Sequence, residues 1–187
     1  MYTLDQLCNS RTLVVDTSPL IGYLPTSGAR GIIDKQVAFT FLVRKAVIEG
    51  KPIYITPRVQ GEYLNPNWEK NCLRAGERRL VDCRKSLVEA FTQKDRVLSF
   101  VGEELQFYDA LKGLLRGMGY ESMVDDTDMD IILTALTLAS RRKKKVGILT
   151  NDSGICGNSK KIFPMTCLPK EAFLVCKRVE KHQFQPW

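Results

Sequence analysis

The chain has 187 residues, of which 44% are apolar, enough to bury one core. Its net charge is +7, and the positive excess lies at the end: residues 1–140 carry 17 Lys and Arg against 18 Asp and Glu, whereas residues 141–187 carry 11 against 3. The longest apolar-rich run, 131–139, is far shorter than the roughly 20 residues of a transmembrane helix, and residues 1–11 lack the apolar segment of a signal peptide. We therefore expect a soluble, cytoplasmic domain with a surface suited to a polyanion.

Six cysteines are present, and we expect them to be reduced and mostly buried, because a domain of this size needs no disulfide and nothing in the chain indicates secretion. No two of them form a CxxC pair, and the only histidine is His182. Zinc sites use such pairs, or cysteine and histidine at short spacing, so a structural zinc site is not expected.

In chain order, the first half of the sequence alternates short apolar runs with helical patterns. The β-branched and aliphatic run 12–15 predicts a strand. Residues 34–49 have the apolar spacing of a helix, and 53–55 predict a second strand. Thr56 and Pro57 are a helix N-cap followed by proline at the first helical position, so another helix is expected to begin there.

The second half continues this alternation. We expect, in order, a long charged helix at 69–93, a strand at 97–101, helices at 103–115 and 127–142, a strand at 146–149, and a last strand and short helix within 162–175. Strands separated by helices predict a three-layer α/β/α sandwich around a mainly parallel sheet. A single domain would span 1–187, with a helical elaboration at about 66–125 and a basic segment at about 166–187.

Carboxylates recur where these elements meet one edge of the predicted sheet. Asp16 follows the first strand, Glu62 lies soon after the second, and Asp152 follows the strand at 146–149. In an open parallel sheet, ligands bind at the carboxyl ends of the strands. Asp128 begins an apolar stripe at helical spacing and should face inward, whereas Asp130 begins a mixed face and ranks second.

These acids would repel one another in a partly buried crevice unless a cation neutralised them. Mg²⁺ and Mn²⁺ prefer oxygen ligands, and one or two such ions could activate water, orient a phosphate and stabilise the leaving oxygen. Simpler interpretations exist: Asp16 as a helix cap, Asp152 as a turn residue, Glu62 as a surface side chain and Asp128 as a partner of the helix dipole. Because four separate coincidences would be needed, metal-assisted phosphodiester hydrolysis is the stronger hypothesis.

Four segments of the chain resemble the motifs of the PIN-domain nucleases: VVDTSPL at 14–20, TPRVQGEYL at 56–64, DMDIILTALTLA at 128–139 and ILTND at 148–152. The resemblance spans residues 12 to about 165, which is nearly the whole expected domain. It implies a PIN-like fold with Ser18 and Thr150 as polar neighbours of a catalytic, metal-binding acidic set, formed by Asp16, Glu62, Asp128 and Asp152.

The same resemblance implies a metal-dependent endoribonuclease that cleaves mostly single-stranded RNA and leaves a 5′-phosphate and a 3′-hydroxyl, either in RNA processing or as a toxin-like ribonuclease. The segment 65–125 is longer than in compact toxin members, and the paired zinc cysteines of one ribosomal-RNA processing branch are absent. RNA is the expected partner, while a homodimer, an antitoxin and a ribonucleoprotein partner stay open.

Three basic residues lie near the predicted carboxyl edge and are the expected phosphate contacts: Arg58, Lys160 and Lys161. The run RRKKK at 141–145 is interpreted as a cap for the end of the helix before it. It should lie too far from Asp128 to touch the scissile phosphate.

Other functions fit the sequence less well. An EF-hand would need Gly where Ile131 stands, and no GxGxxG or GxxxxGK[ST] motif is present for a nucleotide. The lone histidine lies in a polar tail, which disfavours a nucleophile with a histidine base. A phosphoacceptor receiver domain would need an acidic pair after the first strand, where Asp16 stands alone. The main alternative is a catalytically silent RNA-binding or scaffolding module with the same fold.

Overall fold

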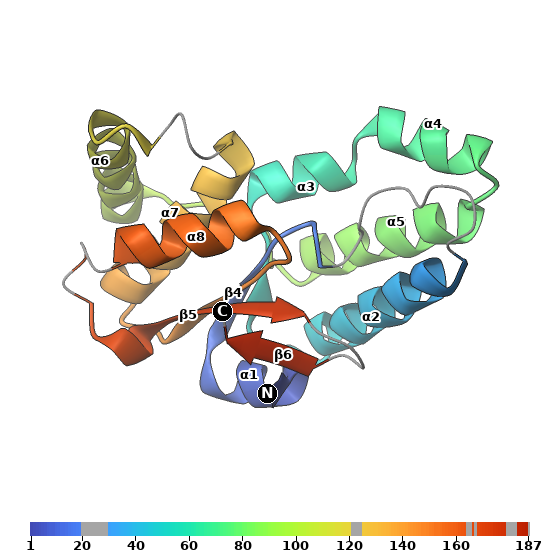
Figure 1. The fold of residues 1–187 in the computed structure, drawn as a ribbon, viewed down its shortest axis with the longest axis horizontal. Coiled ribbons are helices and arrows are strands. Elements are labelled where there is room, and N and C mark those ends of the chain that lie inside the picture. The colour runs from blue at the N-terminus through green and yellow to red at the C-terminus, as the bar shows by residue number, and fades with distance from the viewer. Residues whose placement is uncertain (20–29, 121–124, 164–165, 167, 179–182, 187) are drawn as a thin grey trace.

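The computed structural model describes residues 1–19, 30–120, 125–163, 166, 168–178 and 183–186. One mixed, mostly parallel and strongly curled sheet runs through this part of the chain, in the order β1-β6-β5-β4-β2-β3 (Figure 1). Neighbouring strands are parallel from β3 to β5, whereas β6 is antiparallel to both β5 and β1. The strands are β1 (Tyr2–Thr3), β2 (Thr12–Val15), β3 (Ile53–Tyr54), β4 (Val146–Leu149), β5 (Phe173–Arg178) and β6 (Gln183–Pro186).

The helices gather in two groups (Figure 1). In one group α5 packs against both α2 and α4, and in the other α7 packs against α6 and α8; α3 contacts a helix of each group. A short helix, α1, lies at the bottom of Figure 1 beside the N-terminus. The bounds are α1 (Leu4–Ser10), α2 (Arg30–Ile48), α3 (Pro57–Tyr63), α4 (Pro66–Arg74), α5 (Arg78–Gln93), α6 (Gly102–Gly117), α7 (Asp126–Arg141), α8 (Ser153–Ile162) and the 3₁₀ turn η3 (Lys170–Ala172).

The α/β fold expected from the sequence is confirmed, as are most of its elements. The predicted strands at 12–15 and 146–149 have the expected bounds, and the helix that begins at Pro57 has the expected Thr56 cap. The predicted helix at 103–115 corresponds to α6, and that at 127–142 to α7. Alternation of apolar and helical patterns was therefore a reliable guide to the parallel part of the sheet.

The predicted helix at 69–93 is wrong as a single element. It breaks into α4 and α5 at Gly76, whose φ of +77° is accessible to glycine and strained for other residues. The predicted strand at 97–101 is also wrong: Val97 makes one parallel bridge with Ile55, and α6 begins at Gly102.

Other differences concern the ends of the sheet and the start of α8. Asp152, for which a turn was one interpretation, is instead the N-cap of α8, whose first residue is Ser153. The sequence reasoning also missed α1 and the strands β1 and β6; the two strands, of two and four residues, are too short to produce a clear periodic pattern.

The core fixes α7 against the central strands. The side chains of β2 and β4 are almost fully buried, and every residue of 131–139 in α7 is buried. α7 packs on both strands, so a displacement of this helix would expose a large apolar area. Each Å² of apolar surface exposed to water would cost about 25 cal/mol of stability. The first turn of α7 is consequently held beside the carboxyl ends of β2 and β4.

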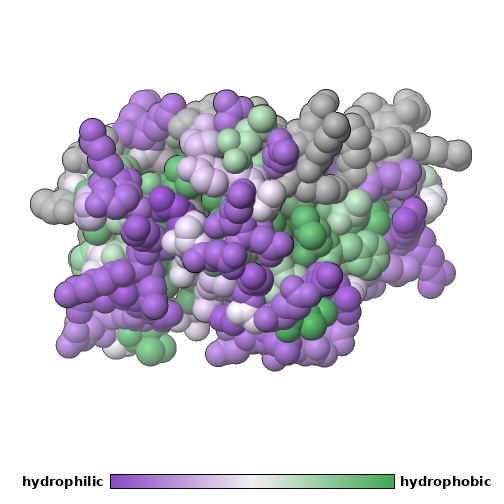
Figure 2. Space-filling view, turned by 90° about the horizontal axis from the view of Figure 1, so that it is seen from below, coloured by the Kyte–Doolittle hydropathy of each residue, from purple (hydrophilic) through white to green (hydrophobic). Residues whose placement is uncertain are grey.

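The cysteines agree with the sequence-based expectation where the structure describes them. Five cysteines are free and buried, while Cys167 lies outside the described residues. Within the described ranges, none of the helices has the length and apolar character to cross a bilayer. Seen from the side of α1, hydrophilic residues predominate among the described residues, with apolar residues exposed between them (Figure 2).

Candidate functional site

Two of the predicted acids follow neighbouring parallel strands. β2 and β4 pair in register with Val15 opposite Leu149, and the Asp16 amide donates to the Leu149 carbonyl at 3.0 Å. Asp16 directly follows β2, and Asp152 comes three residues after the end of β4. The register of one strand pair therefore brings these two chain segments to the same edge of the sheet.

Asp16 is the most buried of the predicted acids, with 3% of its surface exposed. Its Oδ2 accepts hydrogen bonds from the hydroxyls of Ser18 and Thr150, the latter at 2.7 Å. Burial raises the pKa of the Asp16 carboxyl, and hydrogen bonds from Ser18, Thr150 and Thr17 oppose that shift. The hydroxyl groups thus orient a carboxylate that water scarcely reaches.

Thr17 joins Asp16 to Glu62, which comes from a different part of the chain. Its hydroxyl oxygen lies 2.8 Å from Glu62 Oε2 and 3.2 Å from Asp16 Oδ1. Glu62 is half-buried on α3, whose N-terminus is fixed by the Thr56 hydroxyl accepting from the Val59 amide. The sequence reasoning did not assign a role to Thr17, although its place in the DTS segment beside Asp16 was a usable signal.

Thr150 joins Asp16 to the loop that carries Asp152. Its hydroxyl donates to Asp16 and accepts from the Asp152 amide at 2.9 Å. The Ser18 hydroxyl acts in the same way, since it donates to Asp16 and accepts from the Asn151 amide at 2.9 Å. The two residues expected as polar neighbours therefore link the ends of β2 and β4.

Asp152 is the N-cap of α8 and lies beside Asp128. Its Oδ1 accepts from the Gly154 and Ile155 amides, and no described residue donates to its Oδ2. A Cβ added to Gly154 would lie 2.8 Å from Asp152 Oδ1 and 3.7 Å from Asp128 Oδ2, so both carboxylates border the same small space over Gly154. Glycine leaves this space open.

Asp128 is the carboxyl group whose pKa is raised by burial and by the neighbouring acids. Its pKa is raised to about 7, first by burial and then by the charges of Asp125, Asp152, Asp16 and Glu62. The other three predicted acids are therefore close enough to Asp128 to act on its carboxyl group. Asp125 adds to the effect because it is the N-cap of α7, where its Oδ1 accepts from the Thr127 and Asp128 amides at 2.8 Å each.

We expect Asp128→Asn to stabilise the metal-free protein in a pH-dependent way. With a folded-state pKa near 7 and an ordinary value of 3.8, the wild type loses stability as the pH rises from about 4 to 7, and the full penalty remains above 7. At pH 8 the variant should gain on the order of 1–2 kcal/mol, a figure discounted because solvent reaches part of the group. Urea unfolding with chelator at pH 5 and pH 8 measures the gain; an equal gain at both would contradict this account.

The carboxylate oxygens of the site are ligands that suit a hard divalent cation, although the acids alone do not surround an ion completely. Among the described residues, no three Asp, Glu, His or Cys side chains lie close enough to hold one metal ion as they stand. Mg²⁺ commonly keeps several waters and uses one or two carboxylates, so a complete protein cage is not required. The carboxylates of Asp128 and Asp152, which border the same space over Gly154, fit such a site. A cation between them would oppose the repulsion that contributes to the raised pKa of Asp128.

Several other predicted site residues have partners of their own. Asp130 accepts a hydrogen bond from the Tyr108 hydroxyl at 2.5 Å, which ties α7 to α6. Arg58 pairs with Asp126 at 3.2 Å, so this expected phosphate contact joins α3 to α7. Lys160 and Lys161 are exposed in the last turn of α8, roughly 12 Å along the helix axis from Asp152.

Arg84 was missed by the sequence reasoning, because a lone arginine in a charged helix gives no signal of burial. It has 5% of its surface exposed, and its Nη2 donates to the Glu62 carbonyl. Its guanidinium carbon lies 3.9 Å from the ring centroid of Trp68 and 5.1 Å from that of Tyr63. Burial lowers the pKa of Arg84 to about 10. This buried cation holds the end of the helix that carries Glu62.

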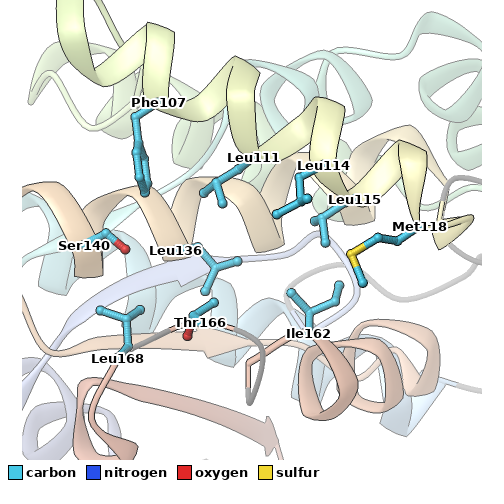
Figure 3. A pocket seen from close by; sticks show the side chains of 10 residues that line it. All are labelled: Phe107, Leu111, Leu114, Leu115, Met118, Leu136, Ser140, Ile162, Thr166 and Leu168. Atoms are coloured by element: carbon cyan, nitrogen blue, oxygen red, sulfur yellow. The ribbon is translucent and has the colours of Figure 1, made fainter.

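An apolar cavity of about 390 Å³ lies between α6, α7 and α8, separate from the acidic residues (Figure 3). Leu111 and Leu115 of α6 face Leu136 of α7 and Ile162 of α8 across it. Among the residues that the structure describes, no charged side chain lines the cavity.

Comparison with protein-family models, with curated proteins and with solved structures finds no match to this chain.

Proposed function

We propose that this chain is a metal-dependent endoribonuclease with a PIN-like, three-layer α/β/α fold. The observation that carries the proposal is the convergence of acids that lie far apart in the sequence: Thr17 bonds both Asp16 and Glu62, and Asp128 and Asp152 border the same space over Gly154. The PIN-like order of the four motifs is the second support. A cytoplasmic location belongs to the same proposal.

In the proposed site, Asp128 and Asp152 hold one Mg²⁺ or Mn²⁺ ion, with Asp16 and Glu62 completing the negative surface for it or for a second ion. A bound ion supplies an activated water and charge stabilisation for in-line hydrolysis of a phosphodiester. The hydroxyls of Thr17, Ser18 and Thr150 keep Asp16 oriented through the hydrogen bonds described above. Single-stranded RNA is the proposed substrate, with a 5′-phosphate product.

The direct test is cleavage of end-labelled RNA with Mn²⁺, with Mg²⁺ and with chelator. We expect internal cleavage of a single-stranded RNA with either ion, little cleavage of a stable duplex, and none with chelator. Products that carry a 5′-phosphate would support hydrolysis by an activated water. Cleavage that persists in excess chelator would contradict metal dependence.

A catalytically silent RNA-binding module is the second candidate. It is favoured by one observation, the lack of any three described ligand side chains that could share one ion as they stand. Tight RNA binding without cleavage, together with no Mn²⁺-dependent rise in thermal stability, would support this module over the nuclease.

A further inference from the structure

The second edge of the parallel sheet, opposite to the acids, is lined by cations. Each of three adjacent parallel strands begins just after basic residues: Arg11 before β2, Lys143 to Lys145 before β4, and Lys170 in the turn η3 before β5. The Thr12 amide donates to the Lys145 carbonyl at 2.8 Å, so the segments before β2 and β4 lie side by side. Strand register thus collects these positive charges, which are scattered in the sequence, at one edge.

Some cations near this edge are already engaged by the protein. Arg141 and Arg142, at the end of α7, pair with Glu103 and Glu104 of α6 at 2.7 Å each. The Arg11 side chain donates to the Glu171 carbonyl at 2.8 Å. These contacts, together with the helix dipole, account for the first two residues of the RRKKK run.

Four lysines at this edge are not engaged by ion pairs of this kind within the described residues. Lys143, Lys144, Lys145 and Lys170 are exposed, and within the described residues none of them makes an ion pair. Lys143 has a φ of +49°, which ends the helical course of the chain before β4. The only carboxylate among the described residues 143–178 at this edge is Glu171. We name these four lysines the basic edge.

The acidic site itself repels the backbone of a nucleic acid, so affinity for a polyanion has to come from cations elsewhere on the surface. Arg58, the expected phosphate contact nearest the acids, already pairs with Asp126 within the protein. Between Lys145 and Asp152 the chain runs the length of β4, whose four residues span roughly 13 Å at a rise of about 3.3 Å per residue. A single strand of RNA is long enough to contact both edges.

We propose that the basic edge binds the phosphate backbone of RNA as a second contact region, remote from the acidic site. The identification of the polyanion as RNA rests on the proposed function, whereas the binding itself needs no cleavage. Lysines bind phosphates as point charges, so the contact is expected to be independent of base sequence.

The test measures RNA binding in the presence of chelator. Fluorescence anisotropy of a labelled single-stranded RNA reports the affinity at several salt concentrations. The variant Lys143→Gln, Lys144→Gln, Lys145→Gln keeps the side-chain stems and removes three charges. We expect its affinity at 0.1 M salt to fall by about tenfold to a hundredfold, and the slope of log affinity against log salt to become shallower by about 2, or about 0.7 per lost phosphate contact.

The matched control is Lys70→Gln, Arg74→Gln, Arg78→Gln, which removes three exposed charges from α4 and α5. It should bind RNA with nearly the wild-type affinity and slope. If both triple variants lose affinity equally, net charge and not the basic edge is responsible, and the proposal fails. If the first triple variant does not fold, Lys144→Gln alone should give about a third of its change in slope.

Two further outcomes would overturn the proposal: wild-type protein that binds no RNA in chelator, or protein that binds anionic phosphatidylserine vesicles through these lysines but not RNA. Failure of the nuclease proposal is distinguishable. If the wild-type protein binds RNA through the basic edge but cleaves none with Mn²⁺, the nuclease proposal fails and the proposal of an RNA-binding basic edge holds. If the first triple variant cleaves RNA with an unchanged KM, only the proposal of the basic edge fails.

Discussion

Replacing Asp152 with asparagine is expected to reduce RNA cleavage by at least about a hundredfold, or roughly 3 kcal/mol of activation free energy, while the fold is retained. Asparagine is as good an N-cap as aspartate, so its side-chain oxygen can keep the bonds from the Gly154 and Ile155 amides and preserve α8. What the variant loses is the negative charge beside Asp128, and with it the attraction for a divalent cation.

The matched control for this variant is Asp125→Asn. Asp125 is also the N-cap of a helix, it accepts two backbone amides in the same way, and it lies near Asp128, but it is exposed and belongs to none of the four PIN-like acids. Initial rates with saturating Mn²⁺, and thermal unfolding of both variants, provide the measurement. Cleavage at the wild-type rate by Asp152→Asn would refute its assignment as a metal ligand.

The second large effect is on stability: Arg84→Ala should lower the free energy of unfolding by about 3 kcal/mol. The truncation removes the stack against Trp68 and Tyr63 and the bond to the Glu62 carbonyl, and it leaves a cavity where a long side chain was buried. Urea unfolding at neutral pH, followed by circular dichroism, measures the loss.

Arg84→Met separates the packing contribution from the charge. The Nε and Nη1 atoms of Arg84 are buried without a hydrogen-bond partner in the described structure, so part of the cost of burying the cation is uncompensated. Methionine keeps an unbranched chain of similar reach without this cost, and we expect it to lie within about 1 kcal/mol of the wild type. Equal losses for alanine and methionine would show that the charge, not the packing, stabilises this region.

Periodic patterns allowed the parallel part of the sheet and the site residues on it to be predicted. The runs at 12–15 and 146–149 are short, apolar and bounded by polar residues, so both strands and the positions of Asp16 and Asp152 after them could be inferred. The inward position of Asp128 followed from the apolar stripe of its helix, and the structure has it half-buried in the first turn of α7. Local sequence carries this information because burial repeats with the period of the element.

Contacts between elements could not be predicted in this way. Nothing local to Thr17 indicates that its hydroxyl meets Glu62, which lies on a helix from another part of the chain. The pairing of Arg58, an expected phosphate contact, with Asp126 depends on how α3 and α7 meet. Burial of Arg84 likewise depends on the packing of α3, α4 and α5 around it.

The sequence by itself determined which residues form the central strands and helices, and that acids would follow two of those strands, because apolar periodicity and capping chemistry act over a few neighbouring residues. Only the tertiary structure decided that Thr17 bonds both Asp16 and Glu62, and that burial and neighbouring carboxylates raise the pKa of Asp128. It also decided that lysines from separate segments, which make no ion pair with the described residues, lie at the opposite edge. Strand register and helix packing set these distances, and both depend on burial summed over the whole chain.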